Sequence, residues 1–147
     1  MKTKRNANLT SEQRLQHMAV EANRTLFTCT SVFPFALFPD KIIVDSTKVV
    51  IHKKVFFLSS EVITILLQDI RLVEMNTGPF FAKLQFEVFG FDDKSISIRY
   101  LRRSDAARIK DLVMGLVAVK DTGINLKHVD SGSLVRSAKK IGSPSAK

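Results

Sequence analysis

The sequence is poor in residues that carry recognisable chemistry, with no tryptophan, one tyrosine and one cysteine among 147 residues. A single thiol, Cys29, cannot form a disulfide bond within the chain, which is typical of proteins from a reducing compartment. Its neighbours, Phe27, Thr28 and Thr30, carry no charge that would lower the thiol pKa. Neither a disulfide framework nor a reactive cysteine is therefore expected.

Catalytic and metal-binding patterns are also absent. His17, His52 and His128 lie far apart, and no cysteine or histidine pair has the spacing of a zinc site. The sequence contains no glycine-rich phosphate loop and no GxSxG nucleophile motif. Asp92 and Asp93 are adjacent, but they fall in a predicted hairpin turn, where aspartate is common for conformational reasons. We therefore expect a noncatalytic protein with no cofactor and no metal, and the sequence identifies no small-molecule substrate.

Long hydrophobic runs are absent as well. The most apolar segment, residues 26–38, spans 13 residues and is interrupted by Pro34, whereas a membrane-spanning helix needs ~20 apolar residues. The basic start of the chain is followed by polar residues instead of the apolar stretch of a secretory signal. These absences predict a cytoplasmic protein, with a position at the membrane periphery as the alternative.

Short apolar segments in the middle of the chain have the two-residue alternation of β-strands. The alternation is regular in residues 83–88 and 95–100, which flank a turn-like cluster and predict a hairpin with one buried face. Further strands are expected at 42–44, 48–58, 62–67 and 69–75, with turns at 45–47, 59–61 and 77–79. About seven closely spaced strands favour a small barrel or a sandwich.

One of these strands is expected to contain a β-bulge. Ile70 and Leu72 share one phase of the alternation, whereas Val73 and Met75 share the other. A change of phase within one strand indicates a bulge, which bends a strand in the way that a small barrel requires.

The apolar period changes from strand to helix after Arg103. Ser104 is the expected N-cap of a helix that ends near Gly123. The apolar face of this helix consists of Ile109, Leu112, Val113 and Leu116. Thr10 and Gln13 have capping-box spacing and predict an earlier helix. A short third helix is expected through Leu134, Val135, Ala138 and Ile141.

Strands followed by one amphipathic helix resemble the pleckstrin-homology-like superfold. More narrowly, the segments Lys48 to Val55 and Val62 to Ile65, then Asp69-Ile70 with Val73, then Gly78-Pro79 before Leu84, are similar to bacterial pleckstrin-homology domains. The resemblance covers residues 40–120 and implies an α+β, mainly β fold. It implies a small barrel of about seven antiparallel strands, closed by the C-terminal amphipathic helix. Members of this superfold bind lipids or peptides or have structural roles, so the resemblance alone does not assign a function.

The charge distribution suggests four regions. We expect a disordered basic tail at 1–9, a helix and apolar arm at 10–39, the pleckstrin-homology-like domain at 40–122, and a short helix with a basic tail at 123–147. The net charge is +9, but residues 1–24 carry five bases against two acids, and residues 123–147 carry five bases against one acid. The domain itself is therefore nearly neutral. The simpler interpretation of the basic ends is that they are solvated tails and not a dedicated binding site.

Two groups of residues are candidate binding sites. Arg99, Arg102 and Arg103 lie at the expected junction of strand and helix, where free backbone N–H groups favour an anion or a lipid headgroup. Phe33, Phe35 and Phe38 lie in the apolar arm and form a candidate interaction patch, unless the arm covers an edge or mouth of the barrel. Lys53 and Lys54 are adjacent in a strand and should point to opposite faces, so we do not expect them to form one patch.

The leading functional hypothesis is a noncatalytic interaction module that binds a protein partner or a second copy of itself. The alternative is peripheral association with anionic membrane lipids, which would be sensitive to salt. Nonspecific nucleic-acid binding by the basic tails is a further alternative. It is not favoured, because the tails contain no aromatic residues for base stacking.

Overall fold

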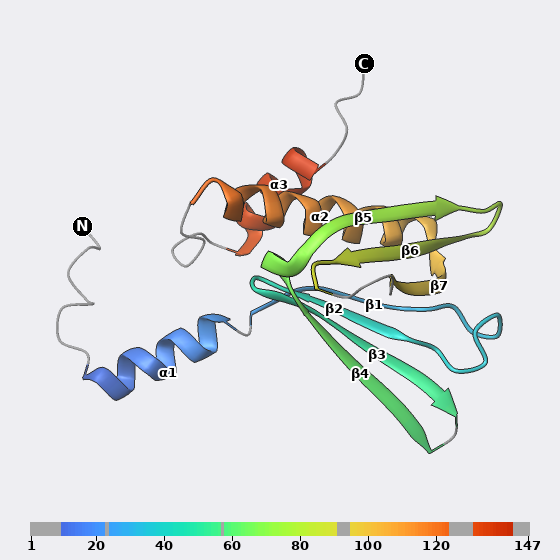
Figure 1. Cartoon of the computed structure of the whole chain (residues 1–147), viewed down its shortest axis with the longest axis horizontal. Helices are drawn as coiled ribbons and strands as arrows, with labels where there is room; N and C mark the ends of the chain where they lie inside the picture. Colours follow the sequence, from blue (N-terminus) through green and yellow to red (C-terminus); the bar gives the residue numbers. More distant parts are fainter. Residues whose placement is uncertain (1–9, 23, 57, 91–94, 124–130, 143–147) are drawn as a thin grey trace.

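A computed structural model of the chain describes residues 10–22, 24–56, 58–90, 95–123 and 131–142. The fold is α+β and mainly β, with two antiparallel sheets and flanking helices (Figure 1). The strands are β1 (Thr25–Thr30), β2 (Lys41–Asp45), β3 (Lys48–Phe56), β4 (Ser59–Leu66), β5 (Ile70–Thr77), β6 (Phe81–Val88) and β7 (Ile96–Arg102). The helices are α1 (Ser11–Ala22), the 3-10 turn η1 (Leu67–Asp69), α2 (Arg103–Asp121) and α3 (Ser131–Gly142).

The first sheet has the strand order β1-β2-β3-β4. Strand β1 lies within the segment expected to be an apolar arm. It pairs with β2 in antiparallel register, with Thr28 opposite Ile43. The sheet therefore begins at Thr25, before the domain boundary expected at residue 40. The turn between β2 and β3 is where the sequence predicts it, and it is fixed by Asp45, whose Oδ1 accepts the backbone N–H of Ser46 at 2.6 Å.

The prediction of a turn at residues 59–61 is wrong. These residues begin strand β4, with Lys53 opposite Glu61 and Phe56 opposite Ser59, so the reversal falls before Ser59. Serine is frequent in turns, but here the continued pairing of the two strands outweighs that local preference.

The second sheet has the strand order β5-β6-β7. The bulge predicted in β5 is confirmed, because the register shifts between Ile70 and Leu72. The shift lets Ile70 and Val73 both point into the core while Leu72 is exposed. The predicted hairpin of β6 and β7 is also present, with Leu84 opposite Ile98.

The prediction of a closed barrel is also wrong, because the described strands form two separate sheets. The chain passes from β4 in the first sheet to β5 in the second through η1, so these two consecutive strands do not form a hairpin. At the opposite corner, the backbone N–H of Val32 donates to the carbonyl of Tyr100 at 2.8 Å, and no strand ladder between the sheets is assigned there. The sheets consequently diverge toward one end of the molecule (Figure 1).

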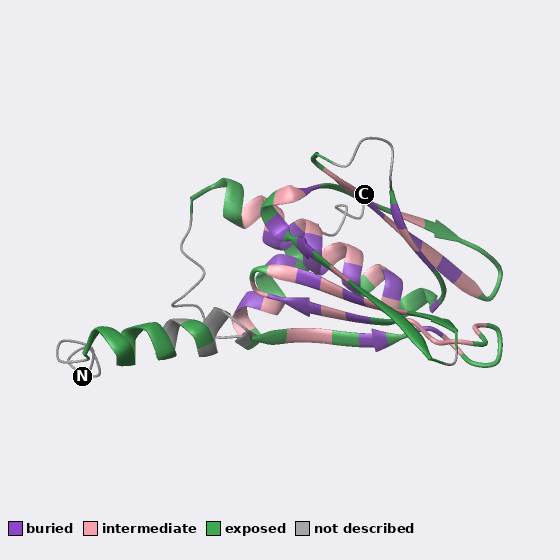
Figure 2. Ribbon diagram, turned by 60° about the horizontal axis from the view of Figure 1, so that its bottom comes forward, coloured by how far each residue is buried: buried purple, intermediate pink, exposed green. Residues whose placement is uncertain are grey.

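The core lies between the two sheets and helix α2 (Figure 2). Helix α2 packs against β5, β6, β7 and η1. Its buried residues include the predicted apolar face, Ile109, Leu112, Val113 and Leu116. Ser104 is not the N-cap as expected, since β7 runs directly into the helix and Arg102 occupies the cap position without a side-chain hydrogen bond.

Helix α3 packs on α2 through the buried residues Leu134 and Ala138. The two helices approach closely where Gly115 and Gly142 have no side chains. A Cβ atom at Gly115 would lie only 1.8 Å from the carbonyl oxygen of Ala138, and one at Gly142 would lie 2.0 Å from that of Asp111. Small residues therefore set the position of α3 against α2.

Helix α1 projects away from the sheets (Figures 1 and 2). Its start agrees with the predicted capping box, since the side chain of Gln13 accepts the backbone N–H of Thr10 at 3.1 Å. Leu15 is 65% exposed. Residues 1–9 and 143–147, where basic tails are expected, lie outside the described residues.

Candidate functional site: an aromatic and basic mouth

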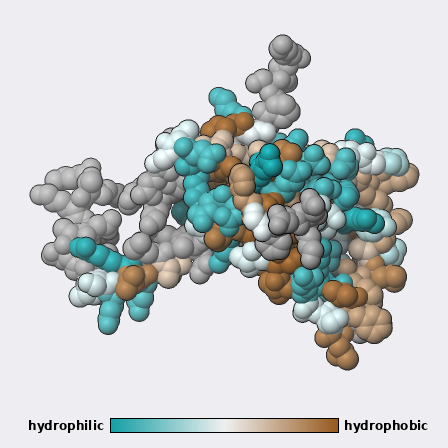
Figure 3. Space-filling view, viewed as in Figure 1, coloured by the Kyte–Doolittle hydropathy of each residue, from teal (hydrophilic) through white to brown (hydrophobic). Residues whose placement is uncertain are grey.

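Exposed apolar side chains gather at the end of the molecule where the two sheets diverge (Figure 3). They come from four segments that are distant in sequence: the loop between β1 and β2, the β3–β4 hairpin, the β5–β6 turn and strand β7. We call this end the mouth. Its exposed apolar residues are Phe33, Phe35, Leu37, Val55, Phe56, Leu58, Phe80 and Tyr100.

Aromatic contacts tie these segments together. The ring centroids of Phe35 in the loop and Phe81 in β6 are 4.7 Å apart, and those of Phe81 and Tyr100 are 6.2 Å apart. On the other side of the loop, the rings of Phe38 and Phe56 are 6.1 Å apart. Such aromatic pairs stabilise an arrangement beyond the area that they bury. The loop is thus held between both sheets by ring contacts.

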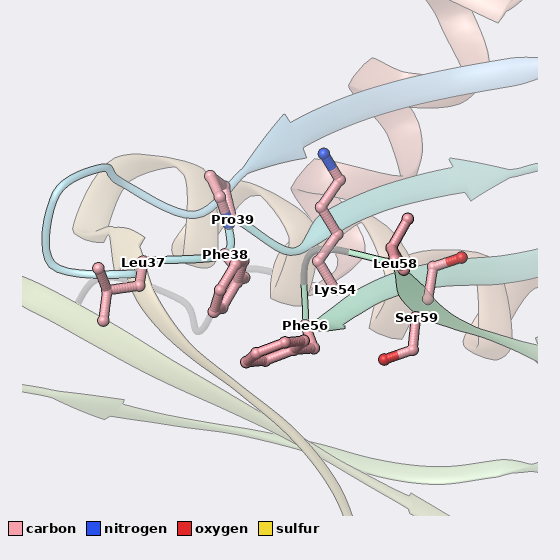
Figure 4. A pocket seen from close by; sticks show the side chains of 8 residues that line it. Leu37, Phe38, Pro39, Lys54, Phe56, Leu58 and Ser59 are labelled. Atoms are coloured by element: carbon pink, nitrogen blue, oxygen red, sulfur yellow. The ribbon is translucent and has the colours of Figure 1, made fainter.

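Three shallow hollows open at the mouth. One, of about 470 Å³, is lined by Phe38, Phe56 and Leu58 together with Lys54, and Figure 4 shows the rings of Phe38 and Phe56 close together and tilted to one another. The second, of about 420 Å³, lies between the loop, β3 and β7. The third, of about 260 Å³, is lined mainly by apolar atoms around Phe80 and Tyr100.

A β-bulge in β7 points two neighbouring side chains outward at the mouth. Arg99 and Tyr100 together lie opposite the single residue Lys83, because the register shifts between Ala82 and Leu84. Both Arg99 and Tyr100 are exposed. Tyr100 has a φ of 59°, a left-handed conformation that is unusual for a bulky residue. Backbone strain of this kind often occurs at functional positions.

Three basic residues, Lys53, Lys54 and Arg99, border the second hollow. The sequence did not predict that Arg99 lies near the two lysines, because it belongs to a strand of the other sheet. The β3 register shifts just beyond the two lysines, between Lys54 and Phe56, whereas Lys53 and Lys54 themselves pair regularly with Glu61 and Ser60. Their side chains therefore alternate between the two faces of the strand, although both residues border this hollow.

Asp40 is the acidic residue in the lining of this hollow. Its Oδ1 accepts the backbone N–H of Lys54 at 3.3 Å, and its own backbone N–H donates to Oγ of Ser31 at 2.7 Å. Burial raises the pKa of the Asp40 carboxyl, and the hydrogen bond from Lys54 and the charge of Lys53 lower it in part. Three basic residues against this one carboxyl group leave the hollow with a positive balance of charge.

The structure separates the candidate residues into two groups. Arg99 joins Phe35 and Phe38 at one hollow, although the sequence placed them in different candidate sites. Phe33 is exposed on the same loop. Arg102 and Arg103 are exposed at the start of α2 and line none of the three hollows. The predicted strand-to-helix anion site therefore does not gather all three arginines around one of these hollows.

Sequence reasoning missed the contributions of Phe56, Leu58 and Phe80 to this surface. Leu58 and Phe80 lie next to predicted turns, and a large apolar residue beside a turn is the signal that could have identified them. Within the described residues, no group of histidine, cysteine, aspartate or glutamate could hold a metal ion. In the same part of the chain, no helix is both long and apolar enough to cross a membrane.

The chain was compared with protein families, curated proteins and solved structures. The chain is similar to a solved PH domain-containing bacterial protein from Exiguobacterium sibiricum, with a TM-score of 0.49 and 18% sequence identity. The match covers 77% of this chain and 56% of the other, so the chain corresponds to little more than half of that protein. No family model and no curated protein matches the sequence. The mouth must therefore be interpreted from its own geometry.

Proposed function

We propose that the protein is a noncatalytic binding module that attaches peripherally to an anionic membrane surface through the mouth. The observation that carries this proposal is the exposure of large apolar side chains on separate loops beside three cations. Leu37 is 77% exposed, Phe80 is 78% exposed and Leu58 is fully exposed. Contiguous apolar surface of this kind marks an interaction site on a water-soluble domain.

The shape of the mouth supports a bilayer as the partner. Its most exposed apolar residues stand at hairpin tips and in a loop, where they can enter the acyl region together. The hollows beside them are shallow, so they offer little burial to a partner that inserts a side chain. Lys53, Lys54 and Arg99 lie next to the tips, where cations can meet anionic headgroups. Each lysine or arginine near an anionic surface contributes about 1 kcal/mol to binding.

A protein partner, the leading hypothesis from sequence, would use the same apolar surface. It differs in its dependence on lipid charge. Flotation of the whole chain with neutral and with phosphatidylserine-containing vesicles separates the two hypotheses. We expect binding to the anionic vesicles at low ionic strength and weaker binding as salt screens the cations. Absence of flotation with anionic vesicles would contradict the membrane proposal and favour the protein partner.

Matched variants locate the binding surface. We expect the triple variant Lys53→Gln, Lys54→Gln, Arg99→Gln to lose about a hundredfold or more in affinity for anionic vesicles. The control is the triple variant Arg136→Gln, Lys139→Gln, Lys140→Gln, which removes the same charge from exposed positions on α3. Equal losses in both variants would mean that attraction depends only on net charge.

Insertion can be followed with a single tryptophan, since the native chain has none. We expect the emission of Phe80→Trp to shift to the blue on anionic vesicles and to be quenched by brominated acyl chains. Ile141→Trp, on the exposed side of α3, should show neither effect. Quenching of both probes, or of neither, would contradict attachment by the mouth.

A further inference from the structure

Strand β4 is an open edge of the first sheet. Within the described residues, β4 pairs with β3 on one side, and the strand order ends there. The edge runs over eight regular residues from Ser59 to Leu66. Its register shift with β3 is caused by an extra residue on β3, so β4 itself is uninterrupted.

Hydrogen bonds show which residues of β4 face the open side. The N–H of Lys54 in β3 points toward the β2 side, where it donates to Asp40, while the N–H of Leu67 donates to the carbonyl of Thr47. Alternate residues of an antiparallel strand bond to opposite neighbours. The residues of β4 that bond to β3 are therefore Glu61, Ile63 and Ile65, opposite Lys53, Ile51 and Val49. The backbone groups of Ser60, Val62 and Thr64 point to the open edge.

The other edge strands carry the features that normally prevent edge-to-edge pairing. Strand β1 has a register shift after Thr25, and β5 has a bulge after Ile70 as well as two exposed charges, Arg71 and Glu74. Strand β7 has the bulge at Tyr100, whose carbonyl already accepts a hydrogen bond from Val32. Strand β4 lacks such protection, because its one charged residue, Glu61, lies opposite Lys53 of its own sheet.

The types of side chain along one face of this edge are symmetric about Val62. The alternate positions on one face, all exposed, are Leu58, Ser60, Val62, Thr64 and Leu66, so an apolar residue alternates with a hydroxyl residue in both directions. In a two-fold antiparallel pair centred on Val62, leucine faces leucine, serine faces threonine and valine faces valine. Cross-strand pairs of this kind stabilise sheets, and a two-fold interface requires such self-complementarity.

Neighbouring registers fit less well. A pair centred on Glu61 places two carboxylates opposite one another, which is unfavourable. A pair centred on Ile63 places Val62 against Thr64 and Ser60 against Leu66. Of these three registers, the one centred on Val62 sets no like charges opposite one another and matches apolar and hydroxyl residues along this face.

We infer that β4 pairs with β4 of a second copy of this chain, centred on Val62, so that two four-stranded sheets join into one continuous sheet. This inference is independent of the proposed membrane attachment, and Leu58 is the mouth residue that the two surfaces share. The two-fold axis is perpendicular to the joined sheet, so the two mouths point in opposite directions.

The mass of the whole chain in solution, measured by light scattering during size-exclusion chromatography, tests this pairing. We expect a concentration-dependent dimer for the native protein. Val62→Lys should shift the protein to monomer, because it sets two ammonium groups against each other. The control, Leu72→Lys at an exposed position on β5, should remain dimeric. A native protein that stays monomeric over the whole range, or a Val62→Lys dimer, would overturn the inference.

A mixing experiment tests the register and excludes misfolding. Val62→Glu alone should also be monomeric, because it sets two carboxylates against each other. An equal mixture of Val62→Lys and Val62→Glu should recover a heterodimer, since residue 62 of each copy meets residue 62 of the other. Circular dichroism should show the same folded content for all variants. Folded variants that do not associate when mixed would show that Val62 does not face itself.

Discussion

Cys29 is a residue whose environment can be described chemically. It lies in β1 with its thiol in the core, and burial raises its pKa to about 12, with a smaller contribution from the charge of Asp105. The ordinary value is 9.0. A thiol of this kind is protonated under all physiological conditions, so it is a poor nucleophile. This agrees with the sequence, in which nothing near Cys29 would activate it.

The raised pKa of Cys29 predicts a loss of stability at high pH. Between pH 9.0 and about 12 the unfolded chain releases the thiol proton while the folded chain retains it. The free energy of unfolding should therefore fall as pH rises through this window, by up to about 4 kcal/mol, and should not depend on this group below it. Urea denaturation at several pH values, compared with Cys29→Ala, isolates the effect. Equal pH slopes for both proteins would contradict it.

At the scale of elements, the contact between α2 and α3 depends on glycine. Gly115→Ala would normally stabilise a helix interior by up to about 1 kcal/mol. Here we expect the opposite, a loss of about 1–3 kcal/mol, because the new Cβ would overlap the backbone of Ala138. Thermal unfolding of the whole chain measures the sign. In a chain that ends at Gly123 the same substitution should no longer destabilise, and a loss there would show that the contact with α3 is not its cause.

The sequence was most informative where apolar alternation was regular. The hairpin of β6 and β7, the bulge after Ile70 and the buried face of α2 were all predicted, because each leaves a periodic pattern of apolar residues. Strand β1 was missed, since Leu26 and Phe27 are both apolar and half-buried and break the alternation. Its role depends on pairing with β2, which local sequence does not encode.

The sequence predicted some residues of the candidate site, but not that they lie together. Apolar residues in the 33–38 segment and the arginine at position 99 could each be noticed in the sequence. Their meeting at one hollow depends on the aromatic contact of Phe35 with Phe81 and on the bulge at Tyr100, which are tertiary features. The same holds for Lys53 and Lys54, which border a hollow together with Arg99 although Arg99 belongs to the other sheet.

At the scale of the whole molecule, the folded unit of sheets and mouth begins at β1. We expect deletion of residues 1–24 to leave the melting temperature nearly unchanged and vesicle binding largely intact, because α1 projects away from the sheets. Deletion of residues 1–30 should destabilise the protein severely, since it removes β1 and exposes the buried residues Ile42 and Val44 of β2. Calorimetry and flotation of both truncated chains test this. Loss of binding without residues 1–24 would assign attachment to the N-terminal segment.

The aromatic composition gives the mouth a natural optical label. Tyr100 is the single tyrosine of the chain, and there is no tryptophan to mask it. Ultraviolet absorption and emission above the phenylalanine bands therefore arise from one phenol ring, held in a left-handed bulge at the entrance between the two sheets. We therefore expect the spectrum of this one residue to change on anionic vesicles if the proposed attachment by the mouth is correct, without any dye or substitution.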